Sequence, residues 1–339
     1  MRKKVVLITG ANGEMGHGLI QYLAKNTDAN IVALDVVPLD KTLRPFCSTY
    51  IVGDILDQML LGRLVVEHEI ATIYHLASIL STKAEYNPET AHRINVEGTM
   101  NLLRLAVEQS QWQGTSVKFI YPSSIAAYGI PSLKEKIGAE PATEDQWNKP
   151  TTMYGCNKFY CELLGRYYNA YYRQLAADCG TTESVDFRAI RFPGLISAET
   201  TPTGGTSDYG PEMLHAAAQH EEYNCFVRPD TTIPFMVMPD AIKALVLLEA
   251  VPKNRLSKYV YNVTSFTLSA QQIFDMVLTA FPDAKIHFAV DDCRQKIVDT
   301  WPEYLDDSAA RMDWDWEPSY DCQRAFYEYL LPSIKKRYQ

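Results

Sequence analysis

The chain has 339 residues, 47% of them apolar and 22% charged, which is the composition of a globular protein with one large domain or two unequal ones. Its formal net charge of −9 argues against binding nucleic acid through the phosphates. No apolar run approaches the ~20 residues of a membrane span, and no targeting segment fits ahead of the first strand, so we expect a cytoplasmic protein without membrane association.

The first predicted strand, residues 4–9, leads into a glycine-rich loop, and helical periodicity begins near Met15. The loop has the spacing GxxGxxG. Glycines at these positions let the backbone turn tightly and approach a pyrophosphate, which the N-terminus of the following helix also favours. The loop residues that we expect to hold a dinucleotide are Gly10, Gly13, Glu14, Met15 and Gly16.

A second predicted strand, residues 30–34, ends at Asp35, about 20 residues after the glycine loop. A carboxylate at this position can accept hydrogen bonds from both ribose hydroxyls of NAD and repels the 2′-phosphate of NADP. The sequence therefore predicts NAD as the cofactor. The alternative interpretation of Asp35 is a turn residue at a strand end.

Strands and helices then alternate, with strands at residues 50–52, 72–76 and 117–121 and helices at residues 60–66 and 88–109. This alternation predicts an α/β fold with a Rossmann-type doubly wound parallel sheet, whose ligands bind beyond the carboxyl ends of the strands. Asp54 and Ile55 follow a strand where an adenine ring would lie. His75 is expected to be a packed histidine. Ser123 and Ser124 lie where a substrate hydroxyl would be met, although a serine pair can also cap a turn.

Tyr154 and Lys158 lie four residues apart in the next predicted helix, which extends to about residue 177, and so share one face. An ammonium close to a phenol favours the phenolate, so we expect Lys158 to lower the pKa of Tyr154 toward that of a general base. Taken alone, the pair is also compatible with an exposed helix face.

The same helix is apolar around more than one stripe. One stripe would cover the sheet, and the second predicts a homodimer through the two long helices that flank the sheet; an aromatic core within one chain is the alternative. The apolar and aromatic residues concerned are Tyr160, Leu163, Leu164, Tyr167, Tyr168, Tyr171 and Tyr172.

After the predicted strand at residues 186–191 the composition changes, and residues 193–209 are rich in Pro, Gly, Thr and Ser. We interpret this segment as a substrate-covering loop and residues 133–149 as a surface loop. We expect an NAD-binding domain over residues 1–190 and a smaller, discontinuous substrate-binding lobe mainly over residues 191–339, with approximate boundaries and interleaved segments. The seven cysteines lack metal or disulfide spacing, which predicts buried thiols and no metal site.

Together these motifs resemble the extended short-chain dehydrogenase/reductases, in the branch of UDP-galactose epimerase. Three further stretches, residues 191–197, 204–209 and 300–311, are similar to the L-threonine 3-dehydrogenases of that branch. The motifs that carry the broader resemblance are the glycine loop, Asp35, His75-Leu76-Ala77, Asn95-Val96-Glu97-Gly98-Thr99, Pro122-Ser123-Ser124 and the Tyr154/Lys158 pair.

The resemblance implies NAD-dependent oxidation of the L-threonine C3 hydroxyl to 2-amino-3-ketobutyrate. Tyr154 would be the general base, Lys158 would tune it and hold the nicotinamide ribose, and Ser124, with help from Ser123, would orient the substrate. The further cofactor contacts that it implies are Leu76, Ala77, Asn95 and Leu195, and the further substrate contacts are Ser81, Thr206 and Trp301.

The chain departs from these dehydrogenases in a longer loop at residues 134–149, in extra residues at 177–184 and in Ser124, where many relatives carry Thr. Serine keeps the hydroxyl that the chemistry needs. Two other functions stay open. A nucleotide-sugar epimerase or dehydratase would need basic side chains for a uridine diphosphate, and residues 204–206 offer none. A non-enzymatic NAD-sensing protein would have little need of the Tyr, Lys and Ser set.

Overall fold

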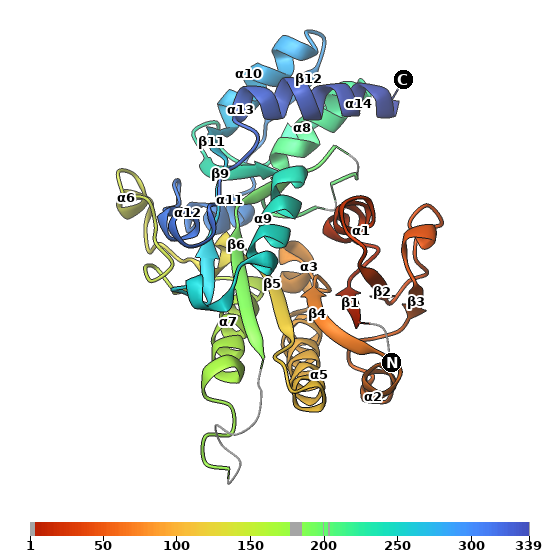
Figure 1. The fold of residues 1–339 in the computed structure, drawn as a ribbon. Helices are drawn as coiled ribbons and strands as arrows, with labels where there is room; N and C mark the ends of the chain where they lie inside the picture. Colours follow the sequence, from red (N-terminus) through yellow and green to blue (C-terminus); the bar gives the residue numbers. More distant parts are fainter. Residues whose placement is uncertain (1–3, 177–184, 199, 203, 339) are drawn as a thin grey trace.

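The computed structural model describes residues 4–176, 185–198, 200–202 and 204–338 (Figure 1). At its centre is a seven-stranded sheet in the order β10-β6-β5-β4-β1-β2-β3, with every neighbouring pair parallel. The order reverses between β1 and β4, where such sheets bind their ligands. The predicted doubly wound α/β fold is confirmed. Its strands are β1 (Lys4–Thr9), β2 (Asn30–Asp35), β3 (Thr49–Val52), β4 (Glu69–His75), β5 (Lys118–Ser124), β6 (Asp186–Phe192) and β10 (Val260–Asn262).

Helices cover both faces of this sheet, each with its own apolar cluster. On one face lie α2 (Gln58–Glu67), α5 (Gly98–Gln113) and α7 (Met153–Ala170), and on the other lie α1 (Glu14–Asn26) and α9 (Met238–Ala250). α1 shows why such sequences fold this way, because it buries Gly16, Leu19, Ile20 and Leu23 at the spacing of one helix face.

Several boundaries differ from the prediction. The helix predicted at residues 88–109 is α4 (Pro88–His92) joined to α5 by a π-helical turn, η2 (Arg93–Glu97). Such a turn inserts an extra residue, and here it buries Asn95. β5 continues to Ser124, so the serine pair ends the strand. α7 ends at Ala170, earlier than predicted, and the extra residues at 177–184 lie outside the described residues.

The second lobe stands above the sheet in Figure 1 and has its own apolar core. It contains a three-stranded sheet, β11-β9-β7, and a two-stranded one, β12-β8. Its strands and helices are β7 (Gly194–Ile196), α8 (Tyr209–Ala218), β8 (Glu222–Cys225), β9 (Thr232–Val237), β11 (Phe266–Ser269), α10 (Ala270–Ala280), β12 (Lys285–Phe288), α11 (Asp292–Asp299), α13 (Cys322–Arg324), η5 (Ala325–Leu330) and α14 (Leu331–Tyr338).

The chain passes between the two parts more than once. α9 and β10 come after segments of the upper lobe, yet α9 packs on the main sheet and β10 pairs with β6. The division at residue 190 stays a prediction with interleaved segments. The remaining short elements are η1 (Arg44–Phe46), α3 (Ser81–Tyr86), η3 (Ile125–Ala127), α6 (Leu133–Lys136), η4 (Lys253–Arg255) and α12 (Ser308–Trp314).

The structure corrects the prediction for residues 133–149. This segment was predicted as a surface loop, but Lys136, Ala142 and Glu144 are buried in it. Their burial follows from contacts with segments far along the chain, such as the bridge between Ala142 and Leu305. A polar composition alone does not reveal such contacts.

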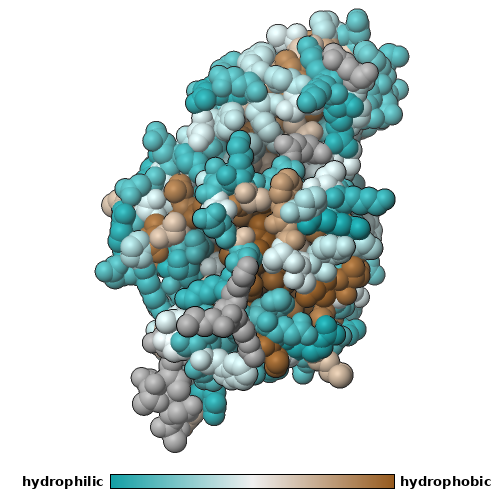
Figure 2. All heavy atoms as spheres, turned by 45° about the vertical axis from the view of Figure 1, so that its right-hand side comes forward, coloured by the Kyte–Doolittle hydropathy of each residue, from teal (hydrophilic) through white to brown (hydrophobic). Residues whose placement is uncertain are grey.

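On the face turned forward in Figure 2, apolar side chains gather in the middle of the molecule, while the upper lobe is mostly hydrophilic. None of the helices within the described ranges combines the length and apolarity needed to cross a membrane. Nor do the described residues contain a group of three or more His, Cys, Asp or Glu side chains placed to hold a metal ion.

Candidate active site

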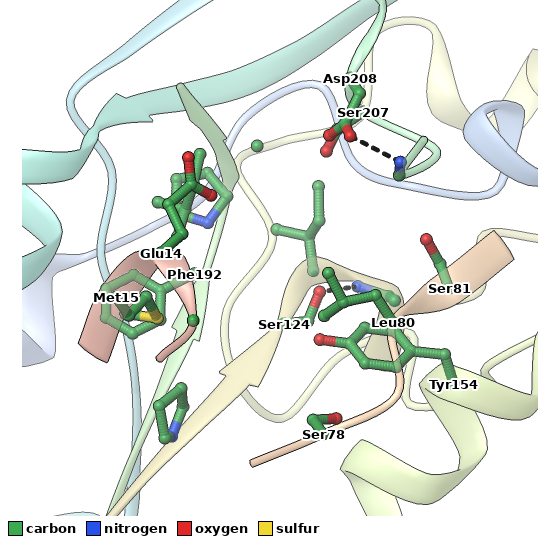
Figure 3. A pocket seen from close by; sticks show the side chains of 18 of the residues that line it. Glu14, Met15, Ser78, Leu80, Ser81, Ser124, Tyr154, Phe192, Ser207 and Asp208 are labelled. Carbon is green, nitrogen blue, oxygen red and sulfur yellow. Dashed lines mark hydrogen bonds between the residues drawn. The ribbon is translucent and has the colours of Figure 1, made fainter. Parts of the chain in front are cut away.

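A cavity of about 270 Å³ opens where the carboxyl ends of the central strands meet the second lobe (Figure 3). The glycine loop, the ends of β4 and β5, the first turns of α7 and the segment after β6 all contribute to its walls. The sequence-predicted site residues that line it are Gly10, Gly13, Glu14, Met15, Gly16, Leu76, Ser81, Ser123, Ser124, Tyr154, Lys158, Leu195 and Trp301.

Three predicted residues lie immediately behind this wall. Ala77 packs against Gly10, Asn95 accepts a hydrogen bond from the backbone N of Ile79 at 2.7 Å, and Thr206 donates its hydroxyl to Ser81 Oγ at 3.1 Å. They support the cavity from behind and do not line it. Asp35, Asp54 and Ile55 lie away from the cavity wall, near the ends of β2 and β3.

The glycine loop allows an approach that no larger residue would permit. Gly10 has a φ of +66°, and a Cβ there would lie 2.6 Å from the backbone N of Ala77. Among the described residues, no side chain caps the first turn of α1, which begins at Glu14. Its amide groups therefore lie at the cavity wall with the positive end of the helix dipole.

Tyr154 is held by the first turn of α7. The Thr152 hydroxyl caps this turn by accepting from Gly155 N at 3.0 Å, and the Glu85 carboxylate accepts from Met153 N at 2.7 Å. A Cβ on Gly155 would overlap the Ala126 carbonyl, so the helix packs directly against η3. Figure 3 shows the hydroxyls of Tyr154 and Ser124 directed to the same space. The helix end and the strand end thus fix the two hydroxyls relative to each other.

Lys158 lies below Tyr154 on the same helix face. Its Nζ donates to the Pro122 carbonyl at 2.7 Å and lies 5.5 Å from the centre of the Tyr154 ring. Burial lowers the pKa of Lys158 to about 8, against the opposing effect of Cys161 and Glu162. An ammonium is therefore present at neutral pH, next to the phenol.

The expected lowering of the Tyr154 pKa is not what this environment produces. Burial raises the pKa of Tyr154 well above its ordinary value, and a hydrogen bond with Ser124 only partly opposes that rise. The physical reason is that the Tyr154 side chain is partly buried at the cavity wall, while the Lys158 ammonium is directed at the Pro122 carbonyl. Lys158 alone does not make Tyr154 a base at neutral pH.

The sequence motifs do not single out Glu162, a buried carboxylate behind the serine pair. Glu162 accepts a hydrogen bond from the Ser123 hydroxyl, and Arg191 donates to its two oxygens at 2.9 and 2.6 Å. The proton of Ser123 is thereby committed to Glu162, so Ser123 can offer a substrate only its lone pairs. The position of Glu162, one turn after Lys158, was a signal that the sequence contained.

The comparisons with known proteins agree with one another. The model of the NAD dependent epimerase/dehydratase family matches residues 6–264 of this chain. The mitochondrial L-threonine 3-dehydrogenase of Bos taurus is 33% identical over 316 residues, which are 93% of this chain and 79% of the bovine protein.

The chain belongs to the NAD dependent epimerase/dehydratase family. Two solved structures show the same likeness over the whole fold. A partial consensus L-threonine 3-dehydrogenase is 35% identical with a TM-score of 0.85, covering 98% of this chain and 99% of that one. A monomeric L-threonine 3-dehydrogenase from a metagenome is 32% identical with a TM-score of 0.85, covering 99% and 100%. A UDP-glucose 4-epimerase from Thermotoga maritima, at 17% identity and a TM-score of 0.79, shares the fold alone.

These matches confirm the predicted family and, with it, NAD as the cofactor. The structure fits NAD at the glycine loop. The uncapped start of α1 and the close backbone approach at Gly10 suit the pyrophosphate of that cofactor. Asp35 ends β2, and its oxygens accept from Asn12 N at 2.9 Å and Val37 N at 3.2 Å, which fixes a carboxylate beside the loop. Asp54 accepts from Leu56 N at 2.9 Å in the turn after β3.

Within this family fold, Glu14 does more than the glycine-loop pattern suggests. Its carboxylate accepts a hydrogen bond from the Thr200 hydroxyl, and burial raises the pKa of Glu14. Asp208, also in the cavity wall, accepts from Gly205 N at 2.6 Å. The segment after β6 therefore contacts the glycine loop directly. His75, by contrast, is the packed histidine expected, because Thr9 and Thr99 occupy its two ring nitrogens at 2.8 and 2.9 Å.

Proposed function

We propose that the protein is an L-threonine 3-dehydrogenase, which oxidises the C3 hydroxyl of L-threonine to 2-amino-3-ketobutyrate. The observation that carries this proposal is the meeting of Tyr154, Ser124 and Lys158 in one cavity beside the glycine loop. The relatives that share nearly the whole chain and carry that name support it.

In this proposal Tyr154 takes the proton of the substrate hydroxyl, which Ser124 orients by a hydrogen bond. NAD⁺, when bound, would supply the hydride acceptor for C3 and a positive charge that favours the phenolate. Because burial raises the Tyr154 pKa, that added charge and the Lys158 ammonium are both needed to bring the phenol within reach of neutral pH. Holding the hydroxyl, the base and the acceptor together contributes a further entropic advantage.

The cavity suits a small polar substrate better than a nucleotide sugar. Of the described lining residues, Lys158 is the one lysine or arginine, and its amine already donates to the Pro122 carbonyl. The diphosphate of a uridine nucleotide would find little positive charge there. Ser81 offers a hydroxyl, Thr206 supports it from behind, and the buried indole of Trp301 closes one side. We propose that Ser81 and Trp301 contact L-threonine and that Thr206, which does not line the cavity, holds the Ser81 hydroxyl in place.

The test is the formation of NADH, followed by absorbance, with L-threonine, L-serine and UDP-galactose as alternative substrates. We expect L-threonine to give the highest kcat/KM. We expect no UDP-glucose from UDP-galactose, and this product is measured separately because epimerisation leaves no net NADH. Epimerisation of the sugar nucleotide without oxidation of L-threonine would refute the assignment.

We also propose that the protein is a cytoplasmic homodimer that pairs through α5 and α7. The outer face of α7 leaves Tyr160, Leu163 and Tyr167 exposed, and Trp112 on α5 is 62% exposed. Tyr168, in contrast, stacks on Tyr172 within the chain, so part of the aromatic stripe is internal. Sedimentation analysis tests this proposal: wild type is expected as a dimer and Leu163→Glu as a monomer. A monomeric wild type would contradict it.

A further inference from the structure

The segment at residues 129–149, here called the strap, connects the two parts of the chain that carry the reacting hydroxyls. It follows η3, the short helix that begins directly after Ser124, and it ends shortly before α7, the helix that carries Tyr154 in its first turn. Its two ends are pinned together: Gly129 N donates to the Trp147 carbonyl at 2.8 Å, and a Cβ on Gly129 would overlap the Lys149 carbonyl oxygen. The strap is therefore a closed loop whose base lies between η3 and α7, and both of these helices contribute residues to the cavity wall.

One side of the strap is fastened to the main sheet. The Glu144 carboxylate accepts from the backbone N of Asn262 in β10 at 2.9 Å, and the Glu144 carbonyl accepts from Arg191 in β6 at 3.0 Å. Glu144 is 7% exposed, so these bonds are shielded from water. This side keeps the strap in a fixed position relative to the sheet.

The other side is fastened to the segment that carries Trp301. The Lys136 ammonium donates to the Val298 carbonyl at 3.1 Å, and the backbone N of Trp301 donates to the same oxygen at 3.1 Å. Two residues away, Ile130 N donates to the Thr300 carbonyl at 2.8 Å. Farther along, Ala142 N donates to the Tyr304 carbonyl at 2.9 Å. The strap thus holds the turn from which the Trp301 indole reaches the cavity.

We propose that Lys136 is a positioning residue: through the Val298 carbonyl it fixes Trp301 in the cavity wall, and the strap thereby sets the affinity for the substrate. This inference rests on the proposed function, because the contact between Trp301 and L-threonine is part of it. It would give a role to the loop at residues 134–149, which the sequence predicts to be longer than in the dehydrogenases that the chain resembles.

The environment of Lys136 indicates that its amine serves to position the Val298 carbonyl more than to stabilise the fold. Its residue is 2% exposed, and burying an ammonium costs free energy unless it is well paired. Asp299 and Glu303 favour the charge from nearby, with a smaller contribution from Asp230, while Arg228 opposes it. Since an apolar side chain of the same length could fill this space at lower cost, the amine contributes chiefly through where it donates.

The test compares Lys136→Met with Lys134→Met, a matched change at an exposed lysine of the same short helix α6. For Lys136→Met we expect KM for L-threonine to rise about tenfold, with kcat within about twofold and KM for NAD unchanged. The melting temperature of Lys136→Met is not expected to fall, whereas replacing a lysine with a merely structural role would lower it. Unchanged KM for L-threonine, or an equal loss in the Lys134→Met variant, would overturn the proposal.

Hydrogen exchange gives a readout that does not depend on the substrate. The amides of Thr300 and Trp301 are hydrogen-bonded, to the carbonyls of Ile297 and Val298. They should exchange faster in Lys136→Met and at the wild-type rate in Lys134→Met. If wild type fails to oxidise L-threonine, the proposed function is refuted, and exchange alone decides the role of Lys136: equal rates in both variants reject it.

Discussion

The two walls of the cavity are built in different ways. The sheet-side wall, from β5, α7 and β6, contains Tyr154, Lys158 and Ser123. Lys158 and Ser123 are held by buried hydrogen bonds, and the buried ion pair of Arg191 with Glu162 supports Ser123 from behind. The lobe-side wall contains Trp301 and the segment after β6, which are held by contacts between loops. The groups proposed to transfer the proton thus lie on the side with the more deeply buried hydrogen bonds, and the groups proposed to select the substrate lie on the side held by contacts between loops.

The buried charges show the same contrast. Arg191 and Glu162 on the sheet side are both almost fully enclosed, whereas the Arg228–Asp299 pair of the upper lobe remains partly exposed. A buried pair depends on both partners being present, while an exposed pair is screened by water. The sheet-side wall should therefore respond to substitution far more strongly than the lobe-side wall. Three experiments test that distinction, and one tests the cofactor edge outside both walls.

The largest expected effect is on chemistry at the sheet-side wall. Tyr154→Phe removes the proposed base without removing its ring, so kcat should fall about 10³-fold while the affinity for NADH stays near wild type. NADH absorbance and NADH fluorescence titration measure the two quantities. Tyr160→Phe, on the exposed side of the same helix, is the control and should keep full activity. Activity retained in Tyr154→Phe would show that another group takes the proton.

The next largest expected effect is on the unfolding free energy of the protein when one partner of each ion pair is removed. Arg191→Leu leaves the Glu162 carboxylate buried without its partner, which should cost about 3–5 kcal/mol of unfolding free energy. Arg228→Leu, at the partly exposed pair with Asp299, should cost no more than about 1 kcal/mol. Urea unfolding of the two variants gives the comparison. Equal losses would mean that the difference in burial between the two ion pairs does not set their contributions to stability.

A smaller effect is expected at the cofactor edge, outside both walls. Asp35→Ala removes the carboxylate that we expect to bind the ribose hydroxyls, so NAD affinity should fall about tenfold and the bias against NADP should relax. Asp54→Ala, after the neighbouring strand, should leave the choice between NAD and NADP unchanged. NADH and NADPH titrations distinguish these results, and an unaltered preference in Asp35→Ala would place the discriminating group elsewhere.

The smallest effect concerns pH and the strap. Burial lowers the pKa of Lys136 to about 8 from its ordinary value of 10.5, so between these values the unfolded chain holds more protons than the folded one. The unfolding free energy of wild type should therefore rise relative to Lys136→Met by about 1 kcal/mol between pH 7 and pH 9. Denaturation at the two pH values measures it, since groups common to both proteins cancel. A relative fall would show that the amine is not buried as described.

Local patterns in the sequence were enough to predict much of the sheet and the closeness of Tyr154 and Lys158 in the cavity wall. Tyr154 and Lys158 share a helix face because they are four residues apart, and the glycine loop and Asp35 have a spacing set by one strand–helix–strand unit. The contact between Lys136 and Val298 joins residues 162 positions apart, and no local rule connects them. The bond from Thr200 to Glu14 spans 186 positions. Nor does spacing reveal burial, which reverses the expected direction of the Tyr154 pKa.

The late return of the chain to the central sheet limits how this protein could be modified. A fragment that stopped at residue 190 would lose β10, leaving β6 as an open edge, and would lose α9, uncovering an apolar face of the sheet. Neither part is therefore a module that could be exchanged whole with a relative. New substrate preferences would have to come from changes within single loops, which can be replaced while the surrounding layers stay intact.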